Sequence, residues 1–175
     1  MARLTAKTRA AARVQAEAIL ASAGLSALWT ECPTGKSPRF PGPCATILEP
    51  GELVVRIARE ARVMLPQSRL TLGYSLLDRE TGSGSFATVY MDRVESLARD
   101  SRTNATVLLS RAIAHEIGHL LLGTAEHSPA GLMRATWTAA ELRLDRAEDW
   151  VFSPAERWQV REALLARRYL GFSIS

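Results

Sequence analysis

Helical periodicity of the apolar positions is the strongest structural signal along this chain. In the first stretch, Val14, Ala18 and Ala21 recur at helical spacing among strong helix formers, and Gly24 is a natural stop. Two capping-box patterns, one beginning at Thr138 and one with the order Ser-Pro-Ala-Glu beginning at Ser153, mark the starts of later helices. The sequence therefore predicts helices over residues 3–23, 94–99, about 105–122, a short stretch from 138 onward, and 154–170.

Short β-prone runs separated by turn residues lie between the first two of these helices. They predict strands over residues 25–32, 53–58, 70–77 and 86–91, and a loop over 33–43, where prolines and glycines gather. Run 86–91 alternates in polarity and is predicted near the edge of the sheet, where an extended peptide can add as a further strand. The alternative is a strand covered on both sides. Together these elements predict an α+β fold.

Length, composition and charge narrow the class of protein. The chain has 175 residues, enough for a hydrophobic core, and is predicted to be a single domain over residues 1–175. Apolar residues make up 47% of it, and no apolar run is long enough to span a membrane. The net charge of +4 comes mostly from scattered arginines, without the interleaved aromatic residues of a groove for single-stranded nucleic acid. We therefore expect a monomer whose partners include neither nucleic acid nor membrane.

The two cysteines, Cys32 and Cys44, are twelve positions apart in the loop rich in proline and glycine. They can form a disulfide, remain as two free thiols, or supply a thiolate that occupies a metal and keeps an enzyme latent. Pairing across a short loop favours the disulfide, which implies an oxidising compartment such as the periplasm or the cell exterior. The first thirteen residues lack the apolar core of a secretion signal, so the sequence leaves the compartment open.

All three histidines lie in one short segment, and two of them form the pattern H-E-x-x-H as His115, Glu116 and His119. Side chains four residues apart share one face of a helix, so both imidazoles can bind one metal ion. Glu116 lies beside them, where a carboxylate can take a proton from a zinc-bound water. Gly123 can end the helix in a left-handed turn, after which the chain can bring back His127 as the third ligand that catalytic zinc needs.

With these residues the chain resembles the metzincin zinc peptidases, whose motif is an H-E-x-x-H-x-x-G-x-x-H run followed by a methionine turn. The resemblance rests on the three histidines, Glu116, Gly123 and Met133. Ser128 after the third histidine and Gly118 before the second are similar to the matrixin branch. The run from His115 to Trp137 also resembles that of a group of small bacterial proteins regarded as peptidases, of matrixin or archaemetzincin type.

The resemblance implies a small domain with a twisted mixed β-sheet, an antiparallel edge strand, an active-site helix and a C-terminal helix. It also implies a zinc-dependent endopeptidase that acts on peptide or protein substrates. Met133 would pack beneath the metal and would not bind it. The spacing differs from the usual motif, because the glycine follows His119 by four residues and the third histidine follows it by eight, where three and six are usual.

Three alternatives stay open at this point. In a gluzincin-like arrangement, a glutamate from a later helix, Glu141 or Glu148, would be the third ligand in place of His127. The protein could also bind zinc without catalysis, or could be a zinc enzyme that hydrolyses something other than protein. Three side chains are candidates for stabilising the oxyanion of the reaction: Tyr74, Tyr90 and Arg134.

Overall fold

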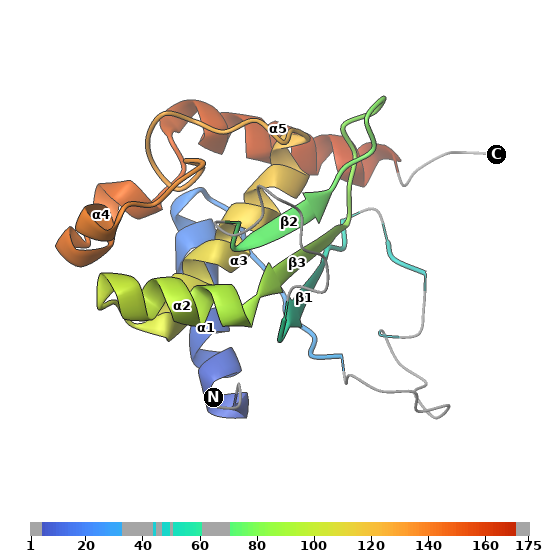
Figure 1. Cartoon of the computed structure of the whole chain (residues 1–175). Coiled ribbons are helices and arrows are strands. Elements are labelled where there is room, and N and C mark those ends of the chain that lie inside the picture. The colour runs from blue at the N-terminus through green and yellow to red at the C-terminus, as the bar shows by residue number, and fades with distance from the viewer. Residues whose placement is uncertain (1–4, 33–43, 45–46, 50, 61–70, 171–175) are drawn as a thin grey trace.

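The fold is α+β, as predicted. The computed structural model describes residues 5–32, 44, 47–49, 51–60 and 71–170 (Figure 1). Its elements in chain order are α1 (Ala6–Ser22), β1 (Val54–Ala58), β2 (Gly73–Leu76), β3 (Phe86–Tyr90), α2 (Met91–Ser101), α3 (Ala105–Leu122), α4 (Ala139–Leu144), a 3-10 turn η2 (Ala147–Trp150) and α5 (Pro154–Leu170). The predicted helices are all present, with α2 longer at both ends than expected. The predicted loop over 33–43 lies outside the described residues.

Helix α3 is the centre of the molecule, and its two ends follow from single residues. The Asn104 side chain accepts a hydrogen bond from the backbone N–H of Thr106 at 2.8 Å, which caps the start. Gly123 adopts the left-handed conformation, φ 66°, and ends the helix as predicted. Every residue from Leu108 to Leu121 is buried, because α1, α2, α5, β2 and β3 all pack against this helix. A helix that is buried on all sides needs such neighbours.

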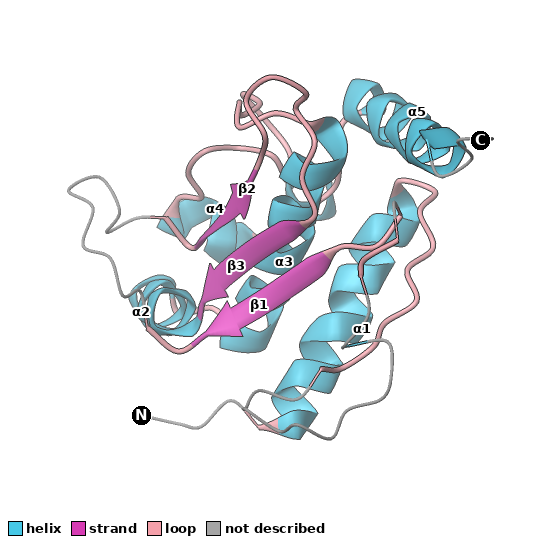
Figure 2. Cartoon of the chain, turned by 90° about the vertical axis from the view of Figure 1, so that its right-hand side faces the viewer, coloured by secondary structure: helices cyan, strands magenta, loops and turns pink. Residues whose placement is uncertain are grey.

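Within the described residues, the sheet has three strands in the order β1-β3-β2, with α3 behind it (Figure 2). β1 and β3 are parallel, with Val54 opposite Phe86, whereas β2 and β3 are antiparallel, with Gly73 opposite Val89. The prediction that run 86–91 lies near the edge is therefore wrong, since β3 is the central strand. The alternating polarity of this run suggested one exposed face, but the central residues of β3 are buried on both faces of the sheet. The antiparallel edge strand is β2, a shorter segment with a weaker pattern.

The predicted strand over 25–32 is also wrong, because these residues pair with no other strand in the part of the chain that is described. Its side chains nonetheless alternate between partly or fully buried and exposed positions, as those of a strand do. Leu25 is buried and Trp29 packs against the core, while Leu28 between them is fully exposed. Side chains that alternate between core and water reproduce the pattern of a strand without its backbone hydrogen bonds.

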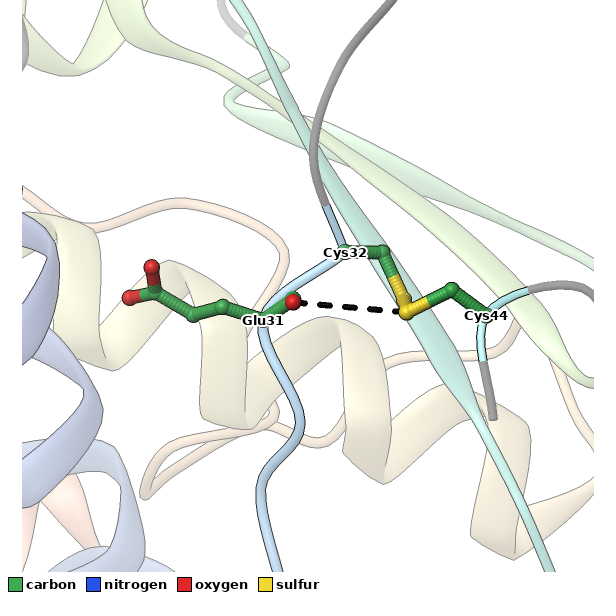
Figure 3. Close-up of a disulfide and its surroundings, with 3 residues drawn as sticks. All are labelled: Glu31, Cys32 and Cys44. Carbon is green, nitrogen blue, oxygen red and sulfur yellow. Dashed lines mark hydrogen bonds between the residues drawn. A yellow bond between two sulfur atoms is a disulfide. The ribbon is translucent and has the colours of Figure 1, made fainter. Parts of the chain in front are cut away.

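Cys32 and Cys44 form a disulfide with a Cα–Cα distance of 5.6 Å (Figure 3). The pairing was the favoured prediction, and it excludes the alternative of a thiolate on the metal. The dashed line in Figure 3 joins Cys44 Sγ to the Glu31 carbonyl oxygen at 4.0 Å, and since a disulfide sulfur carries no hydrogen we regard this as a contact only. Among the described residues, no helix is long and apolar enough to cross a membrane.

Candidate metal centre

Helix α3 presents His115 and His119 on one face, as the spacing predicts. Both side chains are buried, and their ring planes are nearly perpendicular, with centroids 4.7 Å apart. Burial at this depth comes from the position of α3 at the centre of the fold. The core of the molecule therefore holds the helix that carries both imidazoles.

Each of these rings is further fixed by a backbone carbonyl. His115 Nδ1 lies 2.8 Å from the carbonyl oxygen of Leu132, and His119 Nδ1 lies 2.8 Å from that of Thr124. A carbonyl only accepts hydrogen bonds, so both Nδ1 atoms must carry the proton. In the neutral rings both Nε2 atoms are then lone-pair donors. This is how metal-binding histidines are generally oriented by the groups around them.

The two Nε2 atoms face each other at 3.0 Å. Two lone pairs at this distance repel each other unless a proton or a cation lies between them. The distance between the two nitrogens can therefore be compared with that expected for two ligands of one metal ion. Two imidazole nitrogens at 2.0–2.1 Å from a tetrahedral zinc are about 3.3 Å apart. The observed separation is close to that value, and nitrogen donors suit zinc and related divalent ions. The residues fit the metal that the motif predicts.

His127 joins the pair from the loop after Gly123. Its ligand atom and those of His115 and His119 all lie within 4.8 Å of one another. The His127 ring centroid is 4.8 Å from that of His119 and 5.4 Å from that of His115. His127 is exposed, whereas the other two are buried, so the cluster opens toward solvent on the His127 side. Three histidines are thus arranged so that they could hold a metal ion with a position left for a further ligand.

Removal from water, nearly complete for two rings and partial for His127, favours the neutral form of the three imidazoles. Removal from water lowers the pKa of His115 to about 3, a shift that the hydrogen bond to the Leu132 carbonyl opposes and the two other histidines reinforce. Burial also lowers the pKa of His119 and of His127. A neutral imidazole is the form that binds a metal. The histidines therefore need not release protons at neutral pH before an ion can bind.

Glu116 points to the edge strand of the sheet. The Ser75 hydroxyl on β2 lies 2.8 Å from one carboxylate oxygen of Glu116 and 2.8 Å from its backbone carbonyl oxygen. A side chain at Gly73, two residues earlier, would lie 2.8 Å from the other carboxylate oxygen, so glycine leaves the room that Glu116 needs. Burial raises the pKa of Glu116 to about 7, and the Ser75 hydrogen bond opposes the shift. This pKa suits a group that exchanges protons near neutral pH.

Met133 packs against α3 at Gly118. It is 1% exposed, and a side chain at Gly118 would lie 2.5 Å from its sulfur and 2.8 Å from Cε1 of Phe152. Gly118 is therefore the position on α3 where Met133, from the loop after His127, contacts the helix. Met133 supports the floor of the site by packing.

A column of rings also supports His115. The Trp137 ring meets the His115 ring edge-on with centroids 5.6 Å apart, and Trp150 meets Trp137 in the same way at 5.5 Å. The guanidinium carbon of Arg111, one turn before His115 on α3, lies 3.8 Å from the Trp150 ring centroid. The column is buried and keeps water from this side of His115.

The alternative ligands and one candidate oxyanion stabiliser that the sequence suggested lie in other surroundings. Glu141 pairs with Arg134 and accepts hydrogen bonds from Thr138, and Glu148 is exposed in η2. Neither belongs to the histidine cluster, so the arrangement with a later glutamate as ligand finds no support. Arg134 also pairs with Asp149 and is thereby withdrawn from an oxyanion role.

The two candidate tyrosines lie away from Glu116. Tyr74 precedes Ser75 on β2, and successive residues of a strand point to opposite faces, so Tyr74 lies on the face away from α3. Its ring is 6.0 Å from that of Tyr90. In the described part of the chain, the ring contacts of the three histidines involve one another and Trp137, and neither tyrosine.

The residues that sequence reasoning missed are partners of the site: Ser75, Trp137, and the carbonyl groups of Thr124 and Leu132. A backbone carbonyl carries no sequence signal. Ser75 lies in a short run that was predicted as a strand, but only the register of the sheet brings it to Glu116.

Comparison of the chain with protein-family models, with curated proteins and with solved structures finds no match.

Proposed function

We propose that this protein is a metzincin-like zinc endopeptidase, in which His115, His119 and His127 bind zinc and Glu116 is the catalytic base. The observation that carries the proposal is the convergence of two Nε2 lone pairs at 3.0 Å, with a third histidine nearby and a buried carboxylate on the next residue of the same helix. Structural ion pairs do not explain this set, because neutral imidazoles that face each other gain nothing without a cation.

Zinc, when bound, would polarise the peptide carbonyl and make a water more acidic. Glu116 then accepts the proton of the attacking water and returns it to the leaving amine. Burial raises the pKa of Glu116 to about 7 in the metal-free protein, and a bound cation would lower it, so that the carboxylate is available as the base at neutral pH. Ser75 holds the carboxylate in one orientation between the two transfers.

The edge strand favours a peptide as the substrate. β2 pairs with β3 on one side only within the described residues, so its other edge offers free backbone groups. An extended peptide can add to such an edge through main-chain hydrogen bonds. Ser75 on this strand contacts Glu116, so a peptide paired with β2 would lie beside the proposed base. The disulfide suits an oxidising compartment, and we propose a secreted or periplasmic enzyme.

The test begins with zinc content and peptidase activity of the purified protein. We expect one zinc per chain, cleavage of unstructured peptides, and loss of cleavage with zinc retained in Glu116→Gln. His127→Ala should bind zinc much more weakly, and Glu141→Gln, the matched control for the alternative ligand, should bind it as wild type does. Full peptidase activity in Glu116→Gln would refute the mechanism. Zinc binding without cleavage of peptides, small amides or esters would indicate a non-catalytic zinc protein.

A further inference from the structure

The loop that follows His127 carries two parts of the metal centre. It is closed by the Ser128 N–H, which donates to the Met133 carbonyl at 2.9 Å. One end of the loop adjoins the ligand His127. The other end includes the Leu132 carbonyl that orients His115. The position of this one loop therefore determines the geometry of two of the three proposed ligands.

The same loop is attached to helix α5. The Ser128 hydroxyl donates to Oε1 of Glu156, and the Leu132 N–H donates to the Val151 carbonyl at 3.0 Å. The second carboxylate oxygen of Glu156 accepts from the Ser153 N–H at 2.7 Å, as the capping box at the start of α5 requires. Glu156 thus connects the first turn of the helix to the loop.

A capping role alone does not explain where Glu156 lies. Glu141 has the same capping position in α4, and its side chain is 30% exposed. Glu156 is only 5% exposed, and the described residues provide no cation to pair with it. Burying a carboxylate is costly unless it gains strong hydrogen bonds. The additional bond that Glu156 makes is the one to Ser128.

We propose that Glu156 is a positioning residue of the metal centre, acting through Ser128 on the loop that presents His127 and the Leu132 carbonyl. The inference rests on the proposed metal site and does not depend on hydrolysis. Loss of the contact should weaken zinc binding about 10- to 100-fold, the usual effect of removing a group that orients a metal ligand.

The test uses Ser128→Ala, which removes the contact and leaves the cap of α5 intact. Zinc affinity is measured by competition with a chelator, and the geometry of the site by the visible absorption spectrum of the protein loaded with Co²⁺. We expect weaker zinc binding and an altered cobalt spectrum. The double variant Ser128→Ala, Glu156→Ala should bind zinc no more weakly than Glu156→Ala alone, since both changes remove the same contact.

Two further variants separate positioning from stability. Ser153→Ala removes the hydroxyl that accepts from the Glu156 N–H at 3.3 Å, so it should lower the free energy of unfolding while zinc affinity stays unchanged. Glu156→Gln keeps an acceptor for the Ser153 N–H and an amide donor for the Ser128 oxygen, and should retain most of the affinity that Glu156→Ala loses.

The outcomes are distinct. Wild-type zinc affinity and an unchanged cobalt spectrum in Ser128→Ala would overturn the inference and leave Glu156 as a helix cap. Equal losses of zinc affinity in Ser153→Ala and Ser128→Ala would overturn it as well, because a general loss of stability would then suffice. If the wild-type protein binds no zinc, this inference and the proposed function both fail. If it binds zinc but cleaves nothing, only the proposed hydrolysis fails.

Discussion

Replacing Glu116 with glutamine should stabilise the metal-free protein above pH 7 while it abolishes the proposed activity. Glu116 is 5% exposed, and its carboxylate has a hydroxyl as its hydrogen-bond donor but no cation in the described structure. Burial raises its pKa from 4.5 to about 7. The folded protein therefore holds a proton between these two pH values that the unfolded chain releases.

The sign follows from this difference in bound protons. Since the folded state binds more protons between pH 4.5 and 7, wild-type stability falls as the pH rises through that window. At 1.36 kcal/mol per pKa unit, the loss is roughly 3 kcal/mol once the pH is well above 7. Glutamine does not titrate, so the variant does not lose this folding stability as the pH rises. Titration of His115 is common to both proteins and cancels in the comparison.

The assay is urea unfolding of chelator-treated wild-type and Glu116→Gln protein at pH 4, 5, 6, 7, 8 and 9. The variant should gain about 3 kcal/mol relative to wild type across the series, and added zinc should reduce the gain because a nearby cation favours the carboxylate. Glu141→Gln is the control with the opposite sign. Hydrogen bonds from Thr138 lower the pKa of Glu141 from 4.5, so its replacement should lose relative stability only at the acid end of the series, as the pH rises to about 5, and the difference should stay level above that.

A stability difference between Glu116→Gln and wild type that stays constant from pH 4 to pH 9 would refute this reasoning. It would mean that the carboxyl group titrates alike in the folded and unfolded states, and hence that Glu116 is not buried against β2 as the structure has it. The proposed role as catalytic base would then lose its physical support.

Two further predictions concern the floor of the site and its pH dependence. Gly118→Ala should lower the free energy of unfolding by about 1–3 kcal/mol, because the new methyl group would lie 2.5 Å from the Met133 sulfur. Gly51→Ala is the control and should change the stability little, because nothing lies within 4 Å of the new methyl group. Urea unfolding at equal pH compares the two variants. Peptidase activity should fall as the pH drops below 7, with an apparent pKa below the value of about 7 that burial gives Glu116, since a bound cation favours its charged form. Activity that increased between pH 7 and pH 5, in samples with constant zinc content, would contradict the role of Glu116 as base.

The parts of the fold that the sequence predicted are those determined by local signals. The apolar periodicity of α3 and its stop at Gly123 predicted the helix, and these signals lie within or beside it. The capping box at Thr138 likewise predicted the start of α4. The two candidate ligands on α3 share a face because helical geometry alone requires it. None of these inferences needed information from distant parts of the chain.

The inferences that failed required long-range pairing. Whether β3 lies at the edge or in the centre depends on which strands join it, and its own alternation does not record that. The segment 25–32 has the burial pattern of a strand and no strand to pair with in the described structure. Ser75 could not be linked to Glu116, nor Ser128 to Glu156, because each contact joins residues distant in sequence. Topology decides such contacts, and local propensity says little about topology.

The unusual spacing between His119 and His127 is accommodated by hydrogen bonds within the added residues. The helix continues to Leu122 before Gly123 turns the chain, and the Thr124 carbonyl then accepts from His119 Nδ1. The Thr124 hydroxyl accepts from the backbone N–H of Glu126 at 3.0 Å, which bends the chain back toward the histidine pair. The added residues thus orient one proposed ligand, His119, and bring the other, His127, back toward it. A glutamate ligand at Glu141 would instead have to leave Arg134 and the helix cap that already hold it, and these contacts favour His127 as the third ligand.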